Sequence, residues 1–390
     1  SESRKWQGNN QISFNKMRSV LKQCQRSNQG RFRVNHLSLN NTRCLAVGKE
    51  STGEDELGSS NQGKIYLELS KATLSSMVVI TSAAGYLSYG GDLSPITCAS
   101  LCAGTSFAAA TAAILNQTIE RKTDKLMKRT CNRPLPSGRI STEGAIGYGV
   151  LSMGASYALL KYGTNDTTLF LGFSNIALYG AYTLAKPRTE WNTWAGAVVG
   201  AIPPVMGWTA AGGDLLALEP ALLGGTLFLW QFPHFFALSW NNRKDYERGF
   251  HQMVPVNDPT GERTAELILK YSLFLLPVPI LAAAADVTSP YFAIGGVGAT
   301  AYLISLAENF EKEKSNKNAH EVFKCSLWYL LVMLGLFVFH RKRGEKKDEP
   351  LDRLQEQMKM FCPHELLTTL GLESICPMTS KKDTGFVVVK

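Results

Sequence analysis

Long apolar segments fill the middle of the chain, whereas polar and charged residues gather at its two ends and in a few connections. A helix crosses the hydrocarbon core of a bilayer in about 17 to 25 apolar residues. Irregular backbone cannot face lipid, so the pattern predicts an all-α polytopic membrane bundle of about nine transmembrane helices. The predicted segments lie near residues 70–90, 95–115, 143–160, 166–185, 191–211, 215–239, 265–286, 289–307 and 322–340.

The same pattern divides the chain into three parts. Residues 1–67 begin with a basic, acid-poor and hydroxyl-rich stretch, which is typical of a mitochondrial transit peptide followed by a linker. A disordered basic tail is the alternative for this part. Residues 68–340 hold the apolar segments and form the predicted membrane domain. Residues 341–390 form a polar C-terminal tail, to which the sequence assigns no role.

The chain is basic, with 41 Lys and Arg residues against 32 Asp and Glu residues. The positions of these cations argue against nucleic acid as a partner, because they lie in connections beside apolar segments. The connections at 116–142, 186–190, 240–264 and 308–321 all hold Lys and Arg residues, whereas the alternate connections hold only Lys161. The positive-inside rule counts Lys and Arg, so it places the first set on the matrix side of the mitochondrial inner membrane. Nine spans place the basic tail on the opposite side, so the side of the C-terminus stays open.

The connection after the second apolar segment carries the clearest chemistry. Asn116, Glu120 and Asp124 follow one another at intervals of four residues, so a helix would present them as one stripe. Carboxylate and amide oxygens bind Mg²⁺, which also binds substrate phosphates. Arg129 and Arg133 follow at the same interval, and a guanidinium group matches phosphate oxygens in pairs. The array predicts a diphosphate site with a metal, and a solvated charged loop is the alternative.

Motifs along the chain extend this interpretation. The stretch 116–135 is similar to the first acidic motif of the UbiA-type intramembrane prenyltransferases, and in particular of their haem O synthase branch. Similarity to that branch runs from about residue 68 to residue 340. The other matching positions are Tyr182, Thr183 and Lys186, the stretches 192–208 and 230–235, and Arg243, Asp245, Tyr246, Gly249 and Met253.

The resemblance implies nine helices around a central cavity and an enzyme that uses Mg²⁺. It further implies transfer of the farnesyl group of farnesyl diphosphate to the vinyl group of haem B (protohaem IX), with release of pyrophosphate, on the route to the haem A of cytochrome c oxidase. A dry apolar cavity would keep water away from the allylic cation. Membrane lipid would surround the bundle. A homo-oligomer and association with the enzymes of haem A synthesis both stay open.

The residues that match the motifs take the roles of that family. The resemblance assigns Asn116, Glu120, Asp124 and Asp245 to the metal and to catalysis. It assigns the diphosphate to Arg129, Arg133 and Lys186. His234 and Tyr246 are the candidates for contact with haem or another acceptor, and for His234 a hydrogen bond to a neighbouring helix is equally open.

Three departures from the family pattern bear on these roles. Glu120 stands where many relatives have Asp, which keeps the charge and lengthens the reach of the carboxylate. Pro187 stands where the branch usually has Arg, so the place of Arg188 is in question. The second loop offers one clear acid, Asp245, and a second metal on that side stays open.

Other functions remain as alternatives. A UbiA-type enzyme that prenylates a quinone precursor such as 4-hydroxybenzoate would share the acidic motifs, although the stretches 200–208 and 230–235 favour the haem branch. A polytopic transporter would also have many spans, but it predicts polar residues paired within the spans. Here the acids lie at the ends of the apolar segments, on one face of the membrane. A non-catalytic scaffold is the third alternative.

Overall fold

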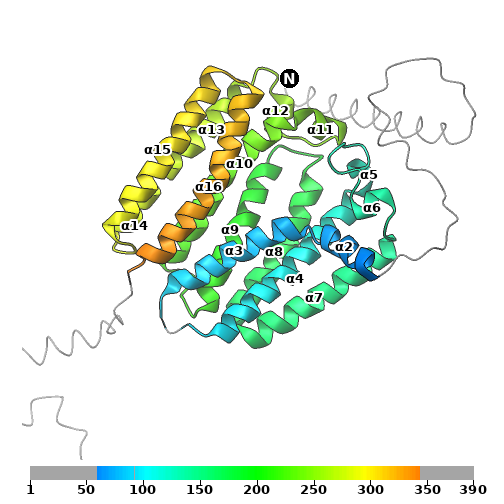
Figure 1. Cartoon of the computed structure of the whole chain (residues 1–390), viewed down its shortest axis with the longest axis horizontal. Coiled ribbons are helices and arrows are strands. Elements are labelled where there is room, and N and C mark those ends of the chain that lie inside the picture. Colours follow the sequence, from blue (N-terminus) through cyan, green and yellow to red (C-terminus); the bar gives the residue numbers. More distant parts are fainter. Residues whose placement is uncertain (1–58, 92, 343–390) are drawn as a thin grey trace, which may run out of the picture. The chain divides into compact units, whose positions relative to one another are not determined.

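The computed structural model describes residues 59–342, apart from residue 92 (Figure 1). Within this part of the chain the regular structure is helical, and its β pairing is limited to one isolated bridge between Thr288 and Arg341. The prediction of an all-α fold is therefore confirmed. The predicted transit peptide and almost all of the C-terminal tail lie outside the described residues.

Helical rods match all nine predicted apolar segments. Among the described residues, six rods are long and apolar enough to cross a membrane, namely α4, α8, α10, α13 with α14, α15 and α16. The crossing of α3, α7 and α9 stays a prediction. The rods are α3 (Ala72–Tyr89), α4 (Pro95–Ile119), α7 (Thr142–Gly163), α8 (Asp166–Ala185), α9 (Asn192–Ala210), α10 (Leu218–Asn241), the pair α13 (Glu262–Leu275) and α14 (Pro277–Ala284), α15 (Pro290–Lys312) and α16 (Asn316–His340).

Polar residues just before the rods explain where several of them begin. The Ser94 hydroxyl accepts a hydrogen bond from the Thr97 N–H, and Pro95 occupies the first turn of α4. Ser141 caps α7 and Asn165 caps α8 in the same way. The first N–H groups of a helix have no partner within the helix, so these caps satisfy donors at the ends of apolar rods.

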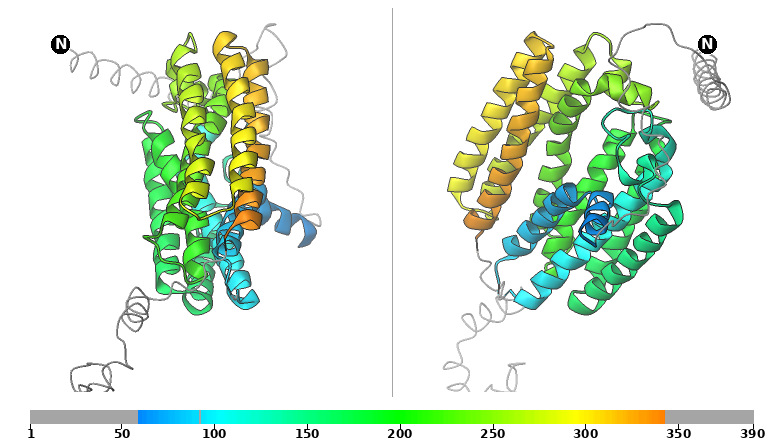
Figure 2. Two further views of the ribbon diagram at one scale, coloured as in Figure 1. Left: turned by 90° about the vertical axis from the view of Figure 1, so that its left-hand side faces the viewer. Right: turned by 45° about the vertical axis from the view of Figure 1, so that its right-hand side comes forward.

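The rods α3, α9 and α10 occupy the middle of the described bundle. In Figures 1 and 2, α4 and α7 lie on one side of them and α13 to α16 on the other, in agreement with the packing of α4 on α7 and of α16 on α10. Aromatic side chains of α10 anchor the core, because Trp230, Phe232 and Phe236 all belong to its largest apolar cluster. This arrangement places α10 between the two halves of the bundle.

The helices α3 and α9 approach each other through glycines. A Cβ atom at Gly85 would come within 1.9 Å of the Pro204 carbonyl oxygen, and a Cβ atom at Gly207 would come within 1.9 Å of the Ser82 carbonyl oxygen. Lipid provides no hydrophobic drive for helix association, so close van der Waals contact between backbones contributes much of the attraction. The two glycines therefore set the spacing of α3 and α9.

We expect Gly207→Ala to lower the free energy of unfolding by about 1 to 3 kcal/mol, because the added methyl group would meet backbone atoms that cannot yield. Gly147→Ala is the control, since a Cβ atom there meets nothing within 4 Å. Denaturant-induced unfolding of both variants in the same detergent would measure the difference. Equal midpoints would show that the close approach of α3 and α9 contributes nothing to stability.

The last described residues lie at the end of the bundle where α3 ends. Arg341 donates a hydrogen bond to the Leu87 carbonyl oxygen, and Lys342 pairs with Asp286. Lys71, at the start of α3, lies at the other end of that helix. This placement agrees with an odd number of spans between the start of α3 and residue 341, and the membrane side of the tail stays a prediction.

Candidate active site

Two polar connections meet at one end of the bundle. The first contains the short helices α5 (Arg121–Asp124) and α6 (Pro134–Ser137), and the second contains α11 (Arg243–Arg248) and α12 (Val254–Asn257). Figure 1 shows all four at the same end of the rods. The Asp245 carboxylate joins the two connections, because its oxygens accept hydrogen bonds from the backbone N–H groups of residues 128 and 129, at 2.8 and 3.1 Å. The two loops that the sequence singled out are therefore neighbours.

The stripe of Asn116, Glu120 and Asp124 is buried. Asn116 and Asp124 have no exposed surface, and Glu120 is 7% exposed. The Asn116 side-chain amide donates a hydrogen bond to Glu120 Oε2 at 2.8 Å. The alternative of a solvated charged loop is therefore wrong for these three side chains.

Each carboxylate of the stripe has a cation beside it. Lys186 Nζ lies 2.9 Å from Glu120 Oε1, and Arg133 Nη1 lies 2.9 Å from Asp124 Oδ2. A buried charge without a partner is strongly unfavourable, so these pairs explain how the acids remain inside the protein. Two of the three predicted diphosphate residues are thus in direct contact with the predicted metal residues.

Lys71 is a site residue that the sequence interpretation missed. It lies between α2 (Ser59–Leu69) and α3 in the left-handed backbone conformation, at φ 48°, and its ammonium group donates a hydrogen bond to Asn116 Oδ1 at 2.6 Å. Such a conformation is costly for a residue with a side chain and persists where the surroundings require it. Burial lowers the pKa of Lys71 to about 7, and the nearby cations Arg133 and Lys186 add to this effect.

The two carboxylates differ in their electrostatics. Burial raises the pKa of Asp124, although Arg133 opposes the effect. Burial alone would also raise the pKa of Glu120, but the positive charge of Lys186 reverses this, and the pKa of Glu120 is lowered. Glu120 is therefore the more firmly ionised acid of the pair.

His251, in the second connection, lies against the stripe. Its Nε2 atom is 4.0 Å from Glu120 Oε1 and its side chain is buried. Burial lowers the pKa of His251 to about 4, with Glu120 acting in the opposite direction. The imidazole is therefore neutral at physiological pH and adds no charge to the site. No short-range pattern in the sequence marks this contact.

Arg129 and Tyr246 lie together, one from each connection. The Arg129 guanidinium lies over the Tyr246 ring, 5.5 Å from its centroid, and Nη2 donates a hydrogen bond to the phenol oxygen at 3.4 Å. Asp245 holds the backbone N–H of Arg129, so it sets the position of this pair. Asp245 of the second connection thus holds the backbone of the first connection in place through its hydrogen bonds.

The donor set fits Mg²⁺ when a phosphate supplies further oxygens. Asp124 Oδ1 is buried and has no hydrogen-bond partner within the described residues, so one hard oxygen is available to a ligand. No group of three or more His, Cys, Asp or Glu side chains among residues 59–342, residue 92 apart, could hold an ion on its own. Glu120, Asp124 and Asp245 therefore do not form a three-acid site by themselves, and the assignment of the four residues to the metal stays a prediction. Asn116, Glu120 and Asp124 form the compact part.

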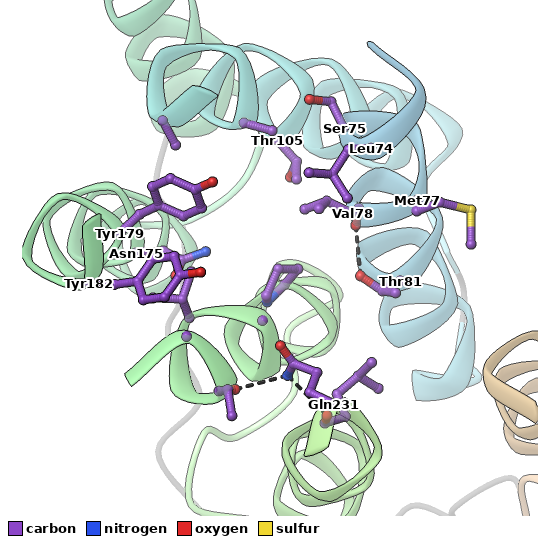
Figure 3. Close-up of a pocket in the computed structure, with 18 of the residues that line it drawn as sticks. Leu74, Ser75, Met77, Val78, Thr81, Thr105, Asn175, Tyr179, Tyr182 and Gln231 are labelled. Atoms are coloured by element: carbon purple, nitrogen blue, oxygen red, sulfur yellow. Dashed lines mark hydrogen bonds between the residues drawn. The ribbon is translucent and has the colours of Figure 1, made fainter. Parts of the chain in front are cut away.

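An apolar cavity of about 340 Å³ begins at Lys71 and lies between α3, α4, α8, α9, α10 and α16. The central cavity that the resemblance implied is therefore present. In Figure 3, side chains of α3 and α8 face each other across it, with Gln231 of α10 at its edge. The labelled residues include Leu74, Val78 and Thr81 on α3 and Asn175, Tyr179 and Tyr182 on α8.

Lys186 and Tyr182 connect the polar end with the cavity. The Lys186 ammonium lies 4.6 Å from the centroid of the Tyr182 ring, which lines the cavity. The same ammonium pairs with Glu120. A ligand with a charged head and an apolar tail would therefore find cations and acids at one end and an apolar chamber directly behind them.

His234 lies on the cavity wall, on α10. Its Nδ1 atom is 2.9 Å from the Ser326 hydroxyl oxygen of α16, and its ring stacks on Trp230 at a centroid distance of 4.7 Å. The hydrogen bond to a neighbouring helix that the sequence left open is therefore present. His234 therefore takes part both in the contact between α10 and α16 and in the wall of the cavity.

Comparison with known proteins matches this chain to the UbiA prenyltransferase family over residues 77–339. The mitochondrial protoheme IX farnesyltransferase of Homo sapiens is 40% identical over 301 residues, which cover 75% of this chain and 67% of that protein. Its counterpart from Arabidopsis thaliana is 37% identical, covering 73% of this chain and 67% of the relative. The protoheme IX farnesyltransferase of Opitutus terrae is 37% identical, covering 71% and 94%.

Solved structures share the fold. A digeranylgeranylglyceryl phosphate synthase superposes with a TM-score of 0.61 at 15% identity, over 72% of this chain and 98% of that one. A UbiA homologue from Archaeoglobus fulgidus bound to GPP and Mg²⁺ superposes with a TM-score of 0.54 at 15% identity, over 70% of this chain and 99% of the homologue. The predicted architecture of an intramembrane prenyltransferase is confirmed by these neighbours.

Proposed function

Since the chain belongs to the UbiA prenyltransferase family, we propose that it transfers the farnesyl group of farnesyl diphosphate to the vinyl group of haem B, and that water then adds to the resulting carbocation, giving haem O and pyrophosphate. The buried stripe, with a cation beside each of its acids, lies at the mouth of an apolar cavity, and this arrangement carries the proposal. It offers a binding place for both ends of a prenyl diphosphate. The protoheme IX farnesyltransferases among the relatives support haem as the acceptor.

The residues of the stripe would bind the diphosphate together with Mg²⁺. Asn116, Glu120 and Asp124 supply the oxygens for the ion, which would neutralise charge on the leaving pyrophosphate. Lys186 and Arg133 each stand beside one of these acids, so phosphate oxygens can replace the carboxylates as their partners. These two acids and two cations would thereby keep charged partners before and after the substrate enters.

The cavity would hold the apolar chain and protect the reactive carbon. Its walls are apolar, and the rings of Tyr179 and Tyr182 line it next to Lys186. Departure of pyrophosphate leaves an allylic cation, which the electron-rich faces of aromatic rings stabilise. Exclusion of water prevents early capture of that cation. His234 and Tyr246 are the proposed contacts for the acceptor.

The proposal extends to placement and organisation. We assign residues 68–340 as the transferase domain of a multi-pass protein of the mitochondrial inner membrane, with residues 1–67 as leader and linker and residues 341–390 as a tail. The Lys and Arg residues of the four connections and the mitochondrial relatives support this assignment. Digestion of isolated mitochondria from a cell that expresses a tagged chain, before and after rupture of the outer membrane, would test it.

The direct test is product formation. Purified protein in detergent, given haem B, farnesyl diphosphate and Mg²⁺, should yield farnesylated hydroxyethyl haem by mass spectrometry, and removal of Mg²⁺ with a chelator should stop the reaction. A parallel reaction with 4-hydroxybenzoate tests the alternative acceptor. If only 4-hydroxybenzoate gives a product, the acceptor is a quinone precursor and not haem. If folded protein gives no product with either acceptor, the proposed function is wrong.

The unusual pKa of Lys71 predicts a pH dependence. Its ordinary pKa of 10.5 falls to about 7 in the folded protein, so the ammonium loses its proton as pH rises through 7. Only the protonated form attracts phosphate. We therefore expect the KM for farnesyl diphosphate to rise by roughly threefold to tenfold between about pH 7 and about pH 8.5.

Lys71→Met supplies the control for this prediction. The variant should have a raised KM throughout, without the component that Lys71 adds to the pH profile. The ionisation of the substrate affects both proteins equally, so the ratio of the two KM values isolates Lys71. A ratio that does not change with pH would mean that Lys71 keeps one protonation state across this range.

A further inference from the structure

The imidazole ring of His234 is held in place by α16. It contacts two aromatic rings, Trp230 at a centroid distance of 4.7 Å and Phe323 at 5.0 Å. Trp230 is itself fixed, because its indole N–H donates to the Ser326 carbonyl oxygen at 2.6 Å. One residue of α16, Ser326, thus holds Trp230 through its backbone and His234 through its hydroxyl. Little freedom remains for the ring to turn.

The hydrogen bonds of Ser326 determine which nitrogen of His234 carries the proton. The Ser326 hydroxyl lies 2.6 Å from the Phe323 carbonyl oxygen, which can only accept, so the hydroxyl proton is donated there. The Ser326 oxygen must then accept from His234, whose Nδ1 atom is 2.9 Å away. A neutral imidazole protonated at Nδ1 has its lone pair on Nε2. Ser326 therefore selects the tautomer with an unprotonated Nε2.

That lone pair has no hydrogen-bond partner among the described residues. In that part of the chain the only hydrogen bond of the His234 ring is the Nδ1 contact to Ser326, and the residue lines the cavity. A neutral imidazole with a free nitrogen, whose other nitrogen is hydrogen-bonded, is the usual arrangement of a histidine that ligates a metal. A purely structural histidine would need only the Ser326 contact.

We propose that His234 Nε2 binds the iron of the haem acceptor as an axial ligand, and that Ser326 is a positioning residue that fixes the tautomer and the ring. The inference rests on the proposed function, because haem is the acceptor there. A bond to the iron holds the macrocycle at its centre and leaves its periphery, where the vinyl groups lie, free to meet the farnesyl carbon.

Haem spectroscopy on the purified full chain tests the proposal. Haem B added to the unaltered protein should show the absorption and electron paramagnetic resonance signals of histidine-ligated iron. His234→Ala should lose them, and added imidazole should restore them by filling the space of the missing ring. Ser326→Ala should weaken haem binding roughly tenfold, as loss of a ligand's hydrogen-bond partner does. Ser326→Thr, which keeps a hydroxyl, should recover most of the affinity.

Controls distinguish the loss of the iron ligand from general damage to the haem-binding pocket. His340→Ala removes the histidine at the far end of the same helix as Ser326, where it contacts Ser289, and should change nothing. Protoporphyrin IX without iron should bind equally to His234→Ala and to the unaltered protein, since it has no metal to ligate. If the unaltered protein makes the farnesylated product but its haem signals match those of His234→Ala, the ligation proposal is wrong while the function stands. If no haem product forms, the proposed function fails first.

Discussion

Asp124→Asn is expected to lower the rate of farnesyl transfer by roughly 10³-fold while haem still binds. Asp124 is fully buried, its Oδ1 atom has no hydrogen-bond partner among the described residues, and its Oδ2 atom pairs with Arg133. The amide keeps the size of the side chain but removes the charge that would bind the metal and balance Arg133. Single-turnover measurement with saturating haem and farnesyl diphosphate would isolate the chemical step.

Two controls make this result specific. Asp166→Asn removes an exposed acid at the first turn of α8, which pairs with Lys161, and should leave the rate unchanged. Haem absorption spectra of Asp124→Asn should match those of the unaltered protein, because the acceptor contacts lie elsewhere. A rate within about threefold of normal would show that Asp124 does not serve the leaving group, and the buried stripe would need another explanation.

The rods of the fold could be predicted because bilayer thickness dictates the length of an apolar span. The predicted bounds of a span are wrong where its helix continues into polar residues. The last span was predicted from residue 322, yet α16 begins at Asn316, where Ser315 accepts a hydrogen bond from the Asn318 N–H. Its first turns carry Lys317, which hydropathy counts as loop although the backbone is helical. Length and apolarity therefore locate a span better than they locate its ends.

The site was predictable where its residues repeat at the interval of one helical turn, from Asn116 at the end of α4, through Glu120 just after it, to Asp124 in α5. The interval of four residues between Asn116 and Glu120 predicts their contact, and the two side chains are hydrogen-bonded. Lys71 reaches the same site from 45 positions away in the sequence, and nothing near Lys71 marks it. A lone lysine before an apolar segment is an ordinary interfacial anchor. Only packing of α3 against α4 turns this lysine into a site residue.

Asp245 makes a contact that the sequence did not predict. The resemblance assigned it to a metal, which stays a prediction, and both of its oxygens accept hydrogen bonds from backbone N–H groups 117 and 116 positions earlier in the chain. The sequence shows that Asp245 is an acid, but it does not show what the carboxylate contacts. The contacts are backbone N–H groups of another loop, and their position depends on how that loop folds. The two roles differ in what they require of Mg²⁺, so they can be separated by measurement.

We expect Asp245→Ala to lower kcat/KM for farnesyl diphosphate by roughly 100-fold, because loss of the two backbone contacts lets Arg129 leave its place over Tyr246. Asp245→Asn retains one oxygen that can accept a hydrogen bond and should lose less. If the carboxylate acts only through the loop, the Mg²⁺ concentration for half-maximal rate stays the same in both variants. A strong rise in the Mg²⁺ concentration for half-maximal rate in Asp245→Asn would show that Asp245 binds the metal.

A double-mutant cycle decides between these roles. Arg129→Met should raise the KM for farnesyl diphosphate on its own, and adding Asp245→Ala should change it little further, because both substitutions remove the same phosphate contact. Arg248→Met is the matched control, since Arg248 also lies near the Asp245 carboxylate, at 3.5 Å, but on the exposed side. Effects of Arg129→Met and Asp245→Ala that simply add would mean that Asp245 acts independently of Arg129, and the anchoring role would be wrong.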